Sequence, residues 1–276
     1  MNDKLDQPPR PADLLFENLF RRGSVNDSFD LLADGIRSAV ANSDRLLSDC
    51  RCLVESGRYA SARFLLTTAR EELAKAPILV DMCRVDLEKN ESVLTRLCRA
   101  FYDHIAKHAY IEVLNFQDIR SMEAVREIWR IEVRKWWPAP PEDGEPDMPH
   151  DTYFDRESPL YVEYGNYDQR WLVPSDHEHG WHFQEMLGDT AITRIDKLVK
   201  PWREAVSEGV IEANILATLN RTFKRHYIGD SCTRTELSRH YKKWAEEVET
   251  ESALPADTAL EAPIVEWPLY HCVANG

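Results

Sequence analysis

Apolar residues recur at steps of three and four along most of this chain, which is the pattern of amphipathic helices. In the segment that follows Gly57, one face carries an alanine at every seventh position: Tyr59, Ala62, Leu66, Ala69, Leu73 and Ala76. Such a face lets a second helix approach closely. The preceding segment, 28–56, has the same period, and Ser56-Gly57 is a typical helix end. Because the connection is short, the two segments predict an antiparallel helical hairpin.

The same spacing predicts further helices and one strand pair. A third helix over 87–114 would bury Leu94, Leu97, Phe101 and Ile105. The remaining predicted elements are a helix over 121–137, a β-hairpin of 160–164 and 170–173 around Gly165-Asn166, and helices from about 181 to a break at Lys200-Pro201, over 201–226 and over 234–250. The fold class is therefore mainly α: a helical bundle with a short β-hairpin insertion and extra C-terminal helices.

Polar and proline-rich segments divide the chain into parts. We predict a flexible N-terminal arm (1–28), the first part of a helical core (29–137), an acidic proline-rich loop (138–150), the β-hairpin with the remaining core helices (151–228), and a C-terminal helix and tail (229–276).

The chain is acidic, with 34 Lys and Arg against 48 Asp and Glu, a net charge of −14. Phosphate backbones would be repelled at long range, which disfavours a general nucleic-acid coat. Two segments are locally basic, 120–137 and 221–243. The first mixes arginine with tryptophan, a combination that suits stacking on bases and equally suits a helix that buries its tryptophans and exposes its arginines.

Other classes of function have little support in the sequence. It has no apolar run long enough to span a membrane and no N-terminal signal peptide, so we expect a cytoplasmic protein without membrane contact. The six cysteines show no disulfide framework, and Gly-rich phosphate loops are missing from a chain with only 10 glycines. The run Asp176–His182 is rich in histidine and carboxylates but fits a solvated loop better than a metal site. We expect no metal and no cofactor.

Two segments of the chain carry a family resemblance. The first runs from Leu31-Leu32-Ala33-Asp34 through the small-residue helix to Glu71-Glu72-Leu73-Ala74-Lys75. The second is Arg156–Tyr164, with Glu163 where an Asp is expected. Together they resemble the AbiV family of abortive-infection proteins, a branch of the HEPN superfamily of helical proteins, over roughly residues 30 to 200.

The resemblance implies a ribonuclease site. HEPN proteins that cut RNA carry an Arg, four to six further residues and then a His. Histidine can transfer a proton near neutral pH, and arginine can hold the phosphate as negative charge develops, so that chemistry requires no metal. Arg99 and His104 have this spacing on the predicted third helix. Ala100 stands where many active HEPN proteins have a polar residue.

Three other Arg/His pairs share the spacing, and Arg221/His226 is the main alternative because many HEPN proteins carry the pair on the last bundle helix. Lys107, His108 and Lys75 are the residues predicted to hold RNA. Glu71 or Glu72 would orient these cations. Spacing alone also allows Glu71 and Lys75 to form a helical salt bridge.

These residues lead to two main hypotheses and a third possibility, a HEPN protein that binds a nucleotide or another small ligand. In the first, the chain is an infection-triggered ribonuclease that acts on RNA, with a phage protein as a possible activator. Since five helical residues turn Arg99 and His104 about 140° apart, the pair would work either across a homodimer or at an irregularity of the helix. In the second, it is a non-catalytic interaction module that senses a phage or host protein.

Overall fold

The computed structural model describes residues 9–116, 118–134, 159–165, 170–174, 189–225, 231–251, 264 and 266–275. Their elements are α1 (Pro11–Phe16), a π-helical turn η1 (Glu17–Arg21), α2 (Val25–Glu55), α3 (Tyr59–Arg84), α4 (Glu91–Tyr102), α5 (His104–Asn115), α6 (Met122–Val133), β1 (Glu163–Gly165), β2 (Arg170–Leu172), α9 (Asp189–Ser207), α10 (Ala213–Arg225), α11 (Arg234–Glu251) and α12 (Tyr270–Asn275). The mainly α class is confirmed.

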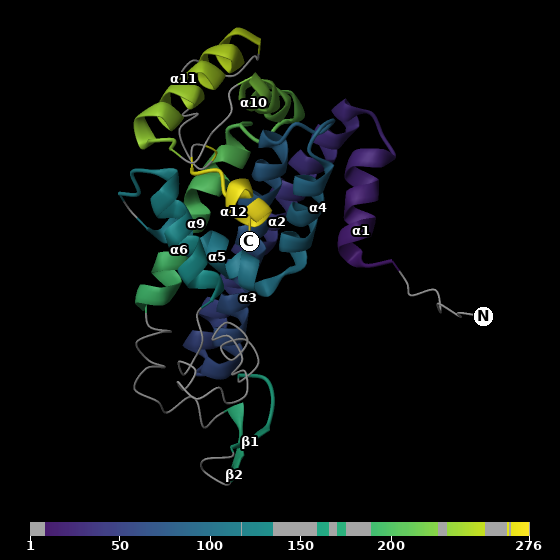
Figure 1. Ribbon diagram of the computed structural model, residues 1–276. Helices are drawn as coiled ribbons and strands as arrows, with labels where there is room; N and C mark the ends of the chain where they lie inside the picture. Colours follow the sequence, from purple (N-terminus) through teal and green to yellow (C-terminus); the bar gives the residue numbers. More distant parts are fainter. Residues whose placement is uncertain are drawn as a thin grey trace, which may run out of the picture.

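The long helices α2 and α3 form the predicted antiparallel hairpin, and the other helices pack around it (Figure 1). Gly57 ends α2 with a φ of +70°, a conformation that glycine adopts without strain. The small-residue seam is buried as predicted, including Ala62, Ala69 and Ala76. Across it, the Ser43 hydroxyl donates a hydrogen bond to the Ala69 carbonyl over 2.7 Å. This close approach is what the alanines permit.

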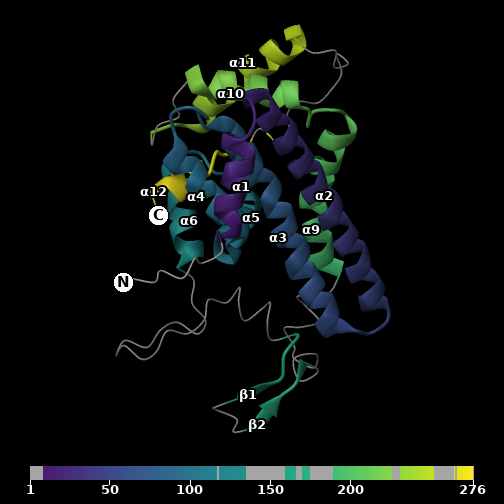
Figure 2. The same ribbon diagram turned by 90° about the vertical axis from the view of Figure 1, so that its right-hand side faces the viewer.

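The predicted flexible arm is wrong for residues 11–21 and 25–28, which are helical. Phe16 and Leu19 are buried, and α1 packs against α4 (Figure 2). Ser24 begins α2 with a capping box, because its hydroxyl accepts from the Asp27 amide and the Asp27 carboxylate accepts from the Ser24 amide. Buried apolar side chains and a helix N-cap therefore order a segment whose overall composition is polar.

The predicted third helix is two helices, α4 and α5, with Asp103 between them. Asp103 has extended backbone angles, φ −81° and ψ 124°, and its carboxylate accepts a hydrogen bond from the Ala106 amide over 2.8 Å. A capping aspartate thus starts a new helix inside a continuous apolar period. Arg99 and His104 consequently lie on different helices.

The predicted helix break at Pro201 is also wrong. Helix α9 continues through Pro201 to Ser207, just as α3 continues through Pro77. Each proline removes one helical hydrogen bond, but buried neighbours such as Val199 and Trp202 keep the helix packed. The chain turns instead at Gly209, where φ is +76°.

The strands β1 and β2 pair in antiparallel fashion, with Tyr164 opposite Trp171. All six cysteines are free thiols. Among the described residues, none of the helices combines the length and apolar character needed to cross a lipid bilayer.

A buried polar network joins α3 to the C-terminal segment. The Asp81 carboxylate binds the Arg84 guanidinium over 2.5 Å and accepts from the Tyr110 hydroxyl over 2.9 Å and from the Leu269 amide over 2.8 Å. Arg84 also donates to the Tyr241 hydroxyl over 2.6 Å. This single network therefore holds together α3, α5, α11 and the chain that leads into α12.

The Asp81→Asn substitution should destabilise the fold by about 3–5 kcal/mol, because it leaves the Arg84 charge buried without its carboxylate. Thermal and urea unfolding would measure the change. The control is Asp49→Asn, which removes an exposed carboxylate paired with Arg45 and should cost at most about 1 kcal/mol. Equal losses in the two variants would contradict the role given to the network.

Candidate active site

Glu71, buried on α3, is the centre of a charged cluster between α3 and α5. One of its carboxylate oxygens, Oε2, lies 2.7 Å from His104 Nδ1 and 2.9 Å from Lys107 Nζ. His104 is the first residue of α5, and Lys107 follows three positions later, so the two side chains lie on one face of the helix. The Asp103 cap that starts α5 thereby sets the face that meets Glu71.

The cluster keeps Glu71 ionised. Burial alone would raise the pKa of Glu71, but hydrogen bonds and charge from His104 and Lys107 outweigh it and hold that pKa below its ordinary value. Lys107 is itself buried, with 5% of its surface exposed. Its burial is at odds with the predicted contact to RNA, and its position shows that it neutralises Glu71.

The contact with Glu71 also orients His104. A carboxylate can only accept, so Nδ1 must carry the proton that it shares with Oε2, and the basic lone pair then lies on Nε2. About a quarter of the His104 side chain is exposed. A histidine held in one tautomer by a buried carboxylate can act as a proton acceptor at Nε2.

The other predicted supporting residues lie beside this cluster with partners of their own. His108 Nε2 lies 3.1 Å from a carboxylate oxygen of Glu132 on α6. Lys75 pairs with Glu72 over 2.5 Å and lies over the Phe101 ring. The alternative that spacing allowed, a helical salt bridge between Glu71 and Lys75, does not form: Lys75 pairs with Glu72, and Glu71 pairs with His104 and Lys107.

Sequence reasoning missed several residues of this region. Glu132 holds His108, Asn42 donates to Glu72 over 2.9 Å, and Arg70 pairs with Glu112. For Glu132 the sequence did contain a signal: helical spacing places it on the same face of α6 as the buried Trp129. No comparable signal marks Asn42.

Arg99 lies on α4, and its side chain forms no hydrogen bond or ion pair with Glu71 or His104. It is exposed and lines a cavity of about 540 Å³ between α4, α5, α6 and α12. The structure thus brings His104 to Glu71 and Lys107 but does not bring Arg99 to His104 within one chain.

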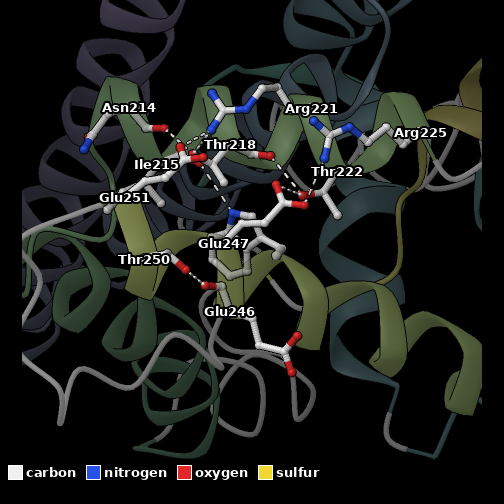
Figure 3. Close-up of polar contacts among 11 residues, drawn as sticks. Asn214, Ile215, Thr218, Arg221, Thr222, Arg225, Glu246, Glu247, Thr250 and Glu251 are labelled. Carbon is white, nitrogen blue, oxygen red and sulfur yellow. Dashed lines mark hydrogen bonds and ion pairs between the residues drawn. The ribbon is translucent and has the colours of Figure 1, made fainter.

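The alternative site is only partly described, because His226 lies outside the described residues. Arg221 on α10 forms an ion pair with Glu251 on α11 and donates to the Thr218 hydroxyl over 3.0 Å (Figure 3). Arg225 pairs with Glu247 over 3.2 Å. Two acidic residues of α11 therefore neutralise Arg221 and Arg225.

The other basic segment contains α6, which buries Trp129 and exposes Arg130. For Trp129 and Arg130 that arrangement is the second of the two expected, while Trp136 and Trp137 lie outside the described residues. Asp176–His182 lies outside the described residues, and the described ones contain no cluster of three His, Cys, Asp or Glu that could hold a metal ion.

The sequence model of the AbiV family of HEPN proteins matches residues 31–191, more than half of the chain. This chain belongs to the AbiV family. The match runs from within α2 to the start of α9, and so includes Glu71, His104 and Lys107, and it confirms the predicted resemblance. The AbiV-family chain is thus a HEPN-domain protein of an abortive-infection family. No curated protein and no solved structure matches it.

The Glu71→Gln substitution should destabilise this AbiV-family protein by about 3–5 kcal/mol at neutral pH, because Lys107 loses its buried counter-charge. The pKa of Glu71 is lowered in the folded state, so its contribution is present above the ordinary value of 4.5 and is lost as pH falls through the folded value. Denaturant unfolding of both proteins from pH 7 to pH 3 would therefore show the difference shrinking with acidity.

The matched control is Glu127→Gln on α6, which removes an exposed carboxylate paired with Arg130. It should cost at most about 1 kcal/mol at neutral pH. A Glu71→Gln loss that stays constant down to acid pH would contradict an ionised, cation-bound Glu71.

Proposed function

We propose that this AbiV-family protein is a metal-independent endoribonuclease in which His104 transfers the proton. The observation that carries the proposal is the contact of 2.7 Å between His104 Nδ1 and the buried Glu71 carboxylate. A carboxylate that fixes the tautomer of a partly exposed histidine is the arrangement a general base requires.

In the proposed reaction, His104 Nε2 accepts the proton of a ribose 2′-hydroxyl. The 2′-oxygen attacks the adjacent phosphorus and the bond from phosphorus to the 5′-oxygen breaks. The products are a 2′,3′-cyclic phosphate and a 5′-hydroxyl, and the proton from the imidazolium passes to the leaving 5′-oxygen. Glu71 stabilises the imidazolium between these two steps.

Arg99 is the proposed phosphate ligand, because a guanidinium can bind two phosphate oxygens as negative charge develops. Within one chain it lines the cavity beside α12 rather than the Glu71 cluster. The proposal therefore requires a homodimer, in which Arg99 from one subunit and His104 from the other meet at one phosphate. Infection, through a phage protein or another signal, would trigger the activity.

A second candidate function is a non-catalytic module that binds a phage or host protein. One observation favours it: Tyr161, Val162 and Trp171, on and next to the β pair, are each more than half exposed, at 59%, 57% and 65%. Aromatic residues of this kind are common anchors of protein interfaces.

Cleavage of total RNA by the purified protein, in buffer with EDTA and with or without an infected-cell lysate, tests the proposal. His104→Ala should lower the cleavage rate by about 100-fold or more, because general acid–base catalysis contributes about that much. The control is His240→Ala, a partly buried histidine on α11, which should cleave like the wild type. Thermal unfolding would verify that both variants fold.

Arg99→Ala should lose activity to a similar degree. A mixture of Arg99→Ala and His104→Ala subunits should recover part of it if the site forms between subunits. Identical RNA profiles for wild type and His104→Ala, with and without lysate, would contradict the ribonuclease and leave the interaction module.

A further inference from the structure

Another cavity of the molecule lies between α2, α10 and α11. It measures about 330 Å³, near the lower end of the range of small-molecule sites, roughly 300–1,000 Å³. It is lined by the first turns of α2, by most of α10 and by the last turn of α11. None of Glu71, His104 and Lys107 takes part in this lining. A function of this cavity therefore does not rest on the proposed ribonuclease.

The buried part of the lining is apolar. Phe29, Ile215 and Val248 come from three different helices, and each is at most 3% exposed. Ala217 adds a partly buried methyl group from α10. An apolar group of a ligand would be stabilised against these side chains, because its transfer out of water is favourable. The cavity therefore favours a small ligand that has an apolar part.

The more exposed part of the lining carries charges of both signs. The carboxylate of Asp30 has no ion pair or hydrogen bond with any residue that the structure describes. Arg221 follows Asn214 and Thr218 along one face of α10 (Figure 3). Its Nη2 donates to the Thr218 hydroxyl over 3.0 Å and to the Glu251 carboxylate. Since a guanidinium has five N–H donors, the Nη1 of Arg221 remains available to a ligand.

These groups favour a ligand that carries both charges. Asp30 lacks a cation, whereas Arg221 can bind an anion, and the positive end of the α10 dipole lies at the cavity. Glu251 already offsets the charge of Arg221, so a doubly charged phosphate would be repelled by two carboxylates. One ammonium and one carboxylate on the same ligand would match both sides. The side-chain amides of Asn26 and Asn214 can donate or accept beside them.

We propose that this cavity binds a free α-amino acid with an apolar side chain. Its ammonium group pairs with Asp30, and its carboxylate binds Arg221 at Nη1. Its side chain lies against Phe29 and Val248. The α-carbon holds the two charged groups and the apolar group together, which is the combination that a small cavity with this lining selects. A His104→Ala protein that cuts no RNA should still bind the amino acid like the wild type.

Titration calorimetry of the full chain with L-valine, L-leucine, L-methionine and L-phenylalanine tests the proposal. Each amino acid is compared with two analogues, the amine that lacks its carboxylate and the carboxylic acid that lacks its ammonium group. For leucine these are 3-methylbutylamine and 4-methylpentanoate. Each analogue should bind at least about tenfold more weakly than the amino acid, because one charge-assisted contact is lost.

Three variants test the residues assigned to the site. Asp30→Asn and Arg221→Met should each weaken binding at least about tenfold. Ala217→Leu should do the same by filling the cavity. The matched controls lie one turn further along the same helices, outside the lining: Asp34→Asn, whose carboxylate pairs with Arg37, and Arg225→Met, whose guanidinium pairs with Glu247. Both controls should bind within about twofold of the wild type.

Thermal unfolding would verify that the variants fold, and Asp30→Asn decides the outcome if Arg221→Met does not, because Asp30 is exposed and supports no other described side chain. Three results would overturn the proposal: no saturable binding of any of the four amino acids, equal binding of an amino acid and either of its analogues, or wild-type affinity in folded Asp30→Asn.

Discussion

Two carboxylates buried on α3 determine how the surrounding helices can pack. Glu71 and Asp81 have little exposed surface, and a buried charge is tolerated only when opposite charges and hydrogen-bond donors surround it. Asp81 is matched by Arg84, the Tyr110 hydroxyl and the Leu269 amide. Glu71 is matched by Lys107 and His104. Helix α5 meets both carboxylates, through Tyr110 and through the cations of its first turn, and this fixes its position along α3.

The same constraint connects the fold to the proposed chemistry. Because Asp81 holds Leu269, the segment before α12 is fixed, and α12 supplies Cys272 and Val273 to the wall of the cavity beside Arg99. Because Glu71 needs cations, His104 is held with Nδ1 toward α3. One long helix therefore supports both the histidine and, through the C-terminal segment, the cavity.

The periodic parts of the fold could be predicted from the sequence. The α2–α3 hairpin and its alanine seam follow from local spacing, because small residues at helical steps form a face that a second helix can approach closely. The division at Asp103 could not be predicted in this way, since apolar spacing continues across it and only the capping geometry ends α4. Pro201 gave a false break because the packing of its neighbours compensates for one lost hydrogen bond.

The contacts within the candidate site likewise could not be predicted from local sequence patterns. His104, Lys107 and Glu71 were predicted as residues of one site, but their contacts were not. Local spacing allowed a Glu71–Lys75 pair, whereas the actual partners of Glu71 are more than thirty positions away. Arg221 looked basic in its own segment, and the acidic residues that neutralise it belong to α11. Long-range pairing of charges depends on the packed fold, which a single sequence pattern does not contain.

The central claim is that the buried Glu71 carboxylate holds His104 with its proton on Nδ1. Long-range ¹H–¹⁵N correlation spectra of the imidazole rings at neutral pH test it most directly, with His104→Gln to assign the signals and Glu71→Gln for comparison. The account predicts that His104 in the wild type is protonated at Nδ1 and bare at Nε2, and that this preference is lost in Glu71→Gln. A proton on Nε2 with a bare Nδ1 in the wild type would contradict it.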